Sequence, residues 1–125
     1  MKKSLTPLGE TEMEILHHVW KMKEATVADI QEEIMKTRKV AYTTVMTIMK
    51  NLADKGYLTY EKQGVTYVYS PARDESEVKH SLLHGLLNKV FKGSPSELVQ
   101  TLVKYEHLTD EERDELKKLI DDMEQ

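Results

Sequence analysis

Short hydroxyl and thioether side chains, with one ammonium group, recur at helical spacing along residues 40–56, VAYTTVMTIMKNLADKG. An apolar stripe at positions i, i+3, i+4 and i+7 predicts a helix here, with Val45, Ile48, Met49 and Leu52 facing inward. Threonine is a poor helix former, yet its hydroxyl bonds to bases and its methyl contacts thymine, while lysine bonds to guanine or phosphate. The opposite face carries Thr43, Met46, Thr47, Lys50 and Asp54, and its hydroxyls, methyl groups and lysine predict contact with DNA.

A plainer interpretation is that Thr43 and Thr44 cap the start of this helix and that the rest of the face is merely solvated. The preceding elements favour the DNA interpretation. Thr6-Pro7 predicts the start of a first helix that runs to about Lys21, and the capping box that opens at Thr26 predicts a second helix that ends near Lys36. With the basic turn at residues 37–39 and the helix over 43–55, these elements form a helix-turn-helix.

The period changes from 3.6 to 2 after Gly56, which predicts strands over residues 57–63 and 66–70 joined by a tight turn at Gly64-Val65. A helix-turn-helix followed by a hairpin is the pattern of a winged helix. The alternative is a plain surface hairpin that covers the core, and the four hairpin tyrosines (57, 60, 67 and 69) are expected to pack in that core. The residues expected to approach DNA phosphates are Lys2, Lys3, Arg38, Lys39, Lys62 and Thr66.

Three further helices follow, with capping signals at Asp74, Ser94 and Thr109. About fifty residues make a marginal core on their own, so a second copy related by a two-fold axis is the simplest cover for their apolar faces. The expected dimer contacts are Leu82, Leu86, Val90, Leu98, Leu102, Leu116, Leu119 and Ile120. The alternative is a monomer in which these helices fold back on the first half of the chain.

Charge divides the chain in the same way. Residues 1–73 carry 11 Lys and Arg against 9 Asp and Glu, a net charge of +2, whereas residues 74–125 carry 7 against 13, a net charge of −6. The basic half is the one expected to face phosphates. The 125 residues include no cysteine, no apolar run of membrane-spanning length and no secretory signal, so a cytoplasmic protein without a membrane partner is expected.

Catalytic motifs are missing from the sequence, which contains no G-x-S-x-G, no H-E-x-x-H and no glycine-rich phosphate loop. We therefore expect no enzymatic activity, no catalytic residues and no cofactor. His80 and His84 stand one helical turn apart, but no third ligand has a convincing spacing, so no metal site is predicted. His17 and His18 are expected to be structural.

Four stretches resemble the winged-helix repressors of the BlaI/MecI/CopY type, the penicillinase repressor family: LTPLGETEMEILHHVW, TVADIQEEI, AYTTVMTIMKNLADKGYL and YVYSPA. The resemblance covers essentially the whole chain. It implies a bacterial homodimer that binds a palindromic operator and represses β-lactam-resistance or copper-homeostasis genes. It also implies major-groove contacts from Thr43, Thr44, Met46, Thr47 and Lys50.

The chain departs from this family pattern at three places. Thr43 and Met46 stand where well-known members carry basic residues, and Thr101-Leu102 aligns with the Asn-Phe bond at which the β-lactam-type repressors are cleaved. The cysteine cluster of the copper-responsive branch is absent. The departures leave the operator, the inducing signal and a regulatory protease open.

The sequence thus predicts a mainly α protein with a small β-hairpin, built from a winged helix-turn-helix DNA-binding domain over residues 1–72 and a three-helix dimerisation segment over 73–125. The function expected is sequence-specific repression of transcription by a homodimer on double-stranded operator DNA. Two alternatives remain: a regulator of related fold that responds to a small molecule or a metal, with a site at His80 and His84, and a winged-helix module that binds another protein.

Overall fold

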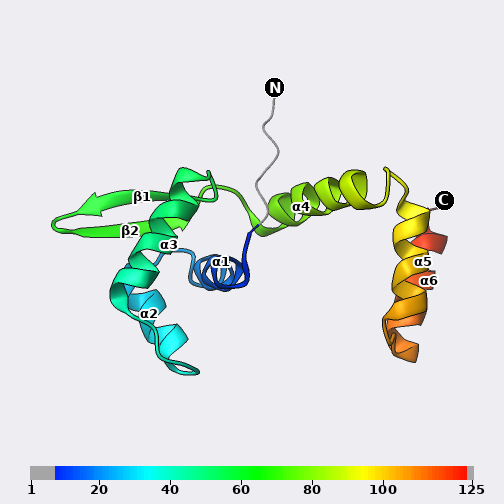
Figure 1. The fold of residues 1–125 in the computed structure, drawn as a ribbon, viewed down its shortest axis with the longest axis horizontal. Helices are drawn as coiled ribbons and strands as arrows, with labels where there is room; N and C mark the ends of the chain where they lie inside the picture. The colour runs from blue at the N-terminus through cyan, green and yellow to red at the C-terminus, as the bar shows by residue number, and fades with distance from the viewer. Residues whose placement is uncertain (1–7, 124–125) are drawn as a thin grey trace. The chain divides into compact units, whose positions relative to one another are not determined.

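The computed structural model describes residues 8–123 and is mainly helical, with one two-stranded antiparallel sheet (Figure 1). This confirms the predicted fold class. The elements are, in order, α1 (Glu10–Met22), α2 (Val27–Met35), α3 (Tyr42–Asp54), β1 (Leu58–Gln63), β2 (Thr66–Pro71), α4 (Glu75–Val90), α5 (Pro95–Tyr105) and α6 (Asp110–Met123). Within the described residues, no helix is long and apolar enough to cross a membrane.

The chain forms two compact units, Met1–His84 and Gly85–Gln125. The first unit holds the hydrophobic core, which α1, α2, α3 and the hairpin build together. Val78 of α4 is fully buried in this core and Leu82 packs against it, so the first half of α4 belongs to the first unit. The boundary near residue 72 between two functional domains stays a prediction.

Helix α1 begins later than predicted. Leu8 and Gly9 are not helical, and the predicted cap at Thr6-Pro7 lies outside the described residues. Gly9 takes the N-cap position, and its N–H donates to Oε1 of Glu12 over 3.1 Å, which satisfies one of the free donors at the helix start. The helix buries Ile15, Leu16 and Val19.

The start of α2 and the end of α3 follow from their local sequence. Thr26 and Asp29 form the predicted capping box, with hydrogen bonds of 3.0 and 3.1 Å. At the end of α3, the N–H of Tyr57 donates to the carbonyl of Leu52 over 2.9 Å, and Gly56 adopts a φ of 89°. This is a Schellman motif, in which glycine supplies the left-handed residue. It turns the chain from α3 directly into β1.

The hairpin has a fixed register, in which Tyr60 pairs with Tyr69 and Lys62 with Tyr67. Gly64 makes the tight turn with a φ of 65°, as predicted. A backbone bridge that the sequence did not indicate ties the hairpin to the helices. Ala25, between α1 and α2, exchanges two hydrogen bonds of 2.8 and 2.9 Å with Tyr69, and this bridge fixes β2 against the helix-turn-helix.

In the second unit, α5 begins at the predicted capping signal, where the hydroxyl of Ser94 accepts from the N–H of Glu97 over 3.1 Å. Thr109 and Glu112 form a matching reciprocal pair at the start of α6, with two hydrogen bonds of 3.0 Å. No side chain is buried among residues 85–122. The apolar residues of this unit are half-buried or exposed.

Candidate nucleic-acid interface

Helix α3 presents two different faces. Val45, Met49 and Leu52 are fully buried, and Ile48 is half-buried beside them. The opposite face consists of exposed side chains, which are Thr43, Thr44, Met46, Thr47 and Lys50. All the residues expected to contact bases are therefore accessible on a single helix whose other side is anchored in the core.

A cleft of about 450 Å³ separates this face from the hairpin. Its lining comes from two elements: Met46, Thr47, Lys50 and Asn51 from α3, and Tyr60, Tyr67 and Tyr69 from the strands. Figure 1 shows α3 lying alongside the β1–β2 hairpin in the first unit. The sequence did not indicate a role at the interface for Asn51, Tyr60 or Tyr67.

Strand alternation explains why the tyrosines meet the cleft. Residues paired across an antiparallel hairpin point to the same face, so Tyr60, Lys62, Tyr67 and Tyr69 share one face. Thr66 pairs with Gln63 on the other face. The alternation of residues along the strands predicts which side chains share a face, but it does not predict which face of the hairpin turns toward α3.

The tyrosines divide into two pairs. Tyr57 and Tyr69 are buried, and burial raises the pKa of both phenols above its ordinary value. Core packing is thus confirmed for these two. Tyr60 and Tyr67 remain 49% and 45% exposed, so the prediction of core packing is wrong for them. Their rings pack edge to face, with centroids 5.3 Å apart.

Arg38, expected to approach phosphates, is held by a carboxylate. Its two guanidinium nitrogens donate to the two oxygens of Glu14 on α1 over 2.8 and 2.6 Å. This hydrogen bonding holds the pKa of the Glu14 carboxyl below its usual range. At the other end of α3, Lys55 contacts Glu12 of the same α1 over 2.7 Å. Two carboxylates of α1 therefore hold the segments that flank α3.

The remaining expected phosphate contacts are more dispersed. Lys39, Lys62 and Thr66 are exposed, while Lys2 and Lys3 lie outside the described residues.

Of the expected dimer contacts, Leu82 packs on the first unit's core, and Leu98 and Leu116 are half-buried. The others are exposed, namely Leu86, Val90, Leu102, Leu119 and Ile120.

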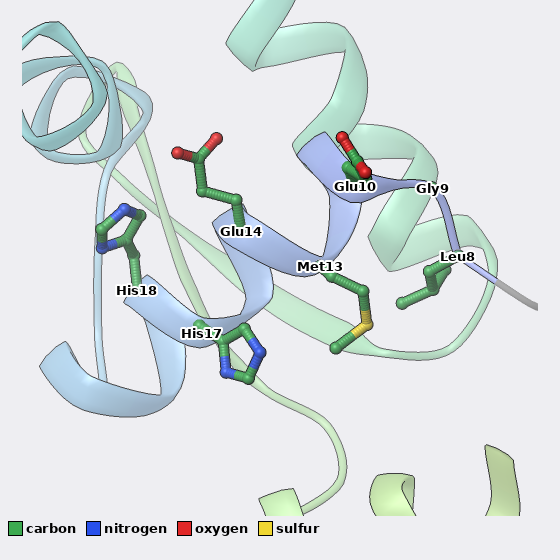
Figure 2. Close-up of a pocket in the computed structure, with 7 residues that line it drawn as sticks. All are labelled: Leu8, Gly9, Glu10, Met13, Glu14, His17 and His18. Carbon is green, nitrogen blue, oxygen red and sulfur yellow. The ribbon is translucent and has the colours of Figure 1, made fainter. Parts of the chain in front are cut away.

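A second hollow, of about 560 Å³, follows α1. Leu8, Met13 and His17 lie along one side of the helix, and Glu14 and His18 lie on the other (Figure 2). Every residue that lines it belongs to the segment 8–18, so the hollow has no opposing wall of the kind that encloses a ligand.

Among the described residues, the histidine pair of α4 likewise shows no sign of a ligand site. The rings of His80 and His84 are stacked with centroids 6.1 Å apart. Within residues 8–123, no three His, Cys, Asp or Glu side chains gather in a group that would hold a metal ion.

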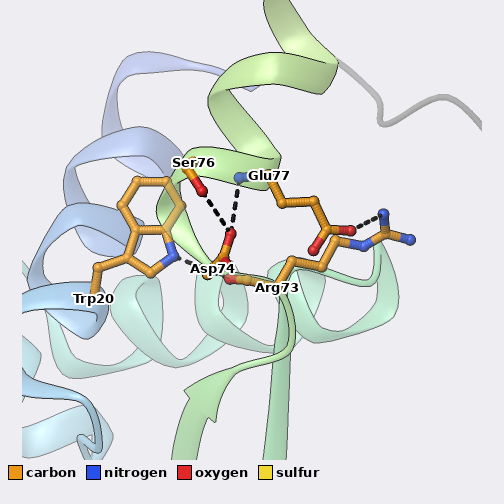
Figure 3. Close-up of polar contacts among 5 residues, drawn as sticks. All are labelled: Trp20, Arg73, Asp74, Ser76 and Glu77. Carbon is orange, nitrogen blue, oxygen red and sulfur yellow. Dashed lines mark hydrogen bonds and ion pairs between the residues drawn. The ribbon is translucent and has the colours of Figure 1, made fainter.

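The junction between the hairpin and α4 is polar and well ordered (Figure 3). The indole Nε1 of Trp20 donates to the carbonyl of Arg73 over 3.3 Å, and Oδ1 of Asp74 accepts from the N–H of Glu77 over 2.8 Å. The Arg73 guanidinium contacts the Glu77 carboxylate over 3.3 Å. Asp74 thus caps α4 as predicted, and the cap fixes the exit of the chain from the hairpin.

Comparison with known proteins shows which family this chain is similar to. The family model described as penicillinase repressor matches residues 8–122. The penicillinase repressor of Bacillus licheniformis is 27% identical over 120 residues, which are 96% of this chain and 94% of that protein.

Two solution structures of the repressor BlaI are similar to part of the chain. Both are 31% identical and cover 62% of this chain and 93% of the solved one. One is the DNA-binding domain, with a TM-score of 0.53. The other is a monomeric form from Bacillus licheniformis in complex with the blaP half-operator, with a TM-score of 0.50.

Proposed function

Because this chain belongs to the penicillinase repressor family, we propose that it is a DNA-binding transcriptional repressor that uses α3 as its recognition helix. Family membership bears out the expectation that the chain is not an enzyme. The observation that carries the proposal is the exposed face of α3, with its hydroxyls and its one ammonium group. The complex of the similar BlaI with a half-operator supports DNA as the ligand of this face.

In the proposed complex, α3 enters the major groove, which is wide enough to admit an α-helix. Thr43, Thr44, Met46 and Thr47 contact base edges and thymine methyl groups, and Lys50 bonds to guanine or phosphate. Lys39, Lys62 and Thr66 approach the backbone, where they fix the orientation of the protein without reading sequence. Lys50 is the one charged group among the residues proposed to contact bases, so the rest of base recognition depends on neutral hydrogen bonds and methyl contacts.

Arg38 has a different role in this proposal from the one expected. Its guanidinium is engaged by Glu14 on both of its terminal nitrogens. It therefore acts first as a positioning residue that holds the turn before α3 against α1. This turn determines where the recognition helix begins.

We also propose that two copies associate through the helices of the second unit. The support is the apolar surface on these helices, where Val90 is 56% exposed and Leu119 is 61% exposed. A two-fold dimer is the commonest arrangement that covers such a surface. Two recognition helices related by this axis would fit a palindrome whose half-sites are separated by a multiple of about 34–36 Å.

The proposal is tested by titrating the full chain onto a genomic fragment that carries the promoter of its own gene, at several salt concentrations. We expect protection of a palindromic segment and a binding constant whose logarithm falls linearly with the logarithm of the salt concentration. Equal, weak binding to that fragment and to random DNA would contradict sequence-specific repression at this promoter. No binding at low salt would favour the alternative of a protein-binding module.

A further inference from the structure

The cleft between α3 and the hairpin is continuous with the base-contacting face, since Met46, Thr47 and Lys50 belong to both. Its far wall is aromatic. Tyr60 and Tyr67 are each about half exposed, and Tyr69 lies buried at the base. When α3 lies in the major groove of an operator, one DNA strand must run past this wall.

The wall is rich in hydrogen-bond donors. The Lys50 ammonium and the Asn51 amide come from α3, and the two exposed phenol hydroxyls come from the hairpin. Lys62 extends the same hairpin face, because it pairs with Tyr67 across the strands. One cation and several neutral donors line the cleft, and Lys62 adds a second cation on the adjoining hairpin face, a set that matches the chemistry of a phosphodiester chain.

The carboxylates nearby are kept away from most of this wall. Glu61 pairs with Val68, so it belongs to the opposite face of the hairpin. Asp54 lies close enough to raise the pKa of Tyr69, after the larger effect of burial. Asp54 is exposed on α3 one turn beyond Lys50 and is not among the residues that line the cleft, whereas Tyr60 and Tyr67 line it and remain suited to an anion.

We propose that this cleft holds the sugar–phosphate backbone of one operator strand, with Tyr60 and Tyr67 as the residues that position it. Their hydroxyls donate to phosphate oxygens, and their rings lie against the deoxyribose. The edge-to-face packing of the two rings, with a 5.3 Å separation, holds both hydroxyls in place before DNA arrives. The inference rests on the proposed function, since it deepens the same site.

The test compares Tyr60→Phe and Tyr67→Phe with the wild-type full chain on operator and on random DNA. Each variant keeps its ring and loses only the donor. Because phosphate contacts carry no sequence information, we expect each variant to weaken binding to both DNAs by the same factor, about three- to tenfold. The neutral phenols leave the salt dependence unchanged, whereas Lys62→Ala lowers the slope of log K against log salt by about 1.

The control is Tyr105→Phe in α5, which removes the hydroxyl of another exposed tyrosine outside the first unit. We expect it to bind both DNAs as the wild type does. Wild-type affinity for both hairpin variants would overturn the inference and leave the proposed function intact. A loss restricted to the operator would also overturn it, because it would assign base contacts to the tyrosines. Failure of the wild type itself to bind DNA would overturn both.

Discussion

Thr47 and Lys50 stand one helical turn apart on the exposed face of α3, and they supply different chemistry. Thr47→Ala removes the hydroxyl and the methyl group that are proposed to contact base edges, and Lys50→Ala removes the cation. We expect each to weaken operator binding by about 1–3 kcal/mol while the thermal midpoint stays unchanged. Fluorescence anisotropy of labelled operator DNA measures the loss.

Lys117→Ala is the matched control for Lys50→Ala, since it removes the same charge from α6. It is expected to retain wild-type affinity. Unchanged operator affinity in both α3 variants would refute the assignment of α3 as the recognition helix.

Glu12 contributes stability that depends on pH. Its hydrogen bond to Lys55 lowers the pKa of the carboxyl from its usual value near 4.5. A lowered pKa in the folded state stabilises the fold above the unfolded pKa, and this stability is lost as the pH falls through the folded value. We expect Glu12→Gln to cost about 0.5 kcal/mol at pH 7, since the pair is partly exposed.

Chemical denaturation at pH 7 and at pH 3 measures this difference. The gap between the wild type and Glu12→Gln should shrink at the lower pH, where the wild-type carboxyl begins to take up its proton. A gap that stays constant between the two pH values would show that charge plays no part in the contact.

For single residues, the sequence predicted burial better than it predicted interaction partners. The burial of Leu16, Val19 and Met49 follows from helical period alone. The sequence did not indicate that Arg38 is engaged by Glu14, because 24 positions separate the two residues. The sequence around a basic residue in a turn is the same whether that residue binds a phosphate or a carboxylate of its own chain.

Among the elements, the clearest local signals were capping residues. The hydroxyl of Thr26 accepts from Asp29 N–H, and its loss leaves that donor at the start of α2 without its cap. We expect Thr26→Ala to destabilise the chain by about 1 kcal/mol and Thr26→Ser, which keeps the hydroxyl, to cost much less. Urea denaturation followed by circular dichroism compares the two, and equal stability of both variants would refute the cap.

Capping boxes were predictable because a hydroxyl and a carboxylate three residues apart carry all the information needed. The bridge between Ala25 and Tyr69 was not predictable, since nothing in a short segment specifies a pairing partner 44 positions away. The same bridge helps to decide which face of the hairpin turns toward α3. Tyr60 and Tyr67 were therefore assigned to the core although they line the cleft.

For the whole molecule, the proposed dimer predicts that a substitution can abolish the gain from a full palindrome while binding to a half-site remains. Leu102→Asp places a charge on the apolar face of α5 and is expected to yield monomers that bind a half-site but lose the added affinity of a full palindrome. Sedimentation equilibrium gives the mass, and titration on half and full sites gives the affinities. Gln100→Asp, a polar position of the same helix, is the control and should stay dimeric.

A dimer that persists in Leu102→Asp would contradict the assigned contact surface. A monomeric wild type would contradict the dimer itself and favour helices that fold back on the first half of the chain.

The indole of Trp20 is the only one in the chain, and it is fixed by the carbonyl of Arg73 and by the edge of His17, whose ring centroid is 5.3 Å away. Light absorbed at the red edge of the protein spectrum therefore excites one chromophore, at the junction of β2 with α4. Its emission will report the state of the winged helix without any attached dye. DNA contributes almost no emission of its own, so the native protein carries a built-in optical probe of how operator binding is felt at this junction.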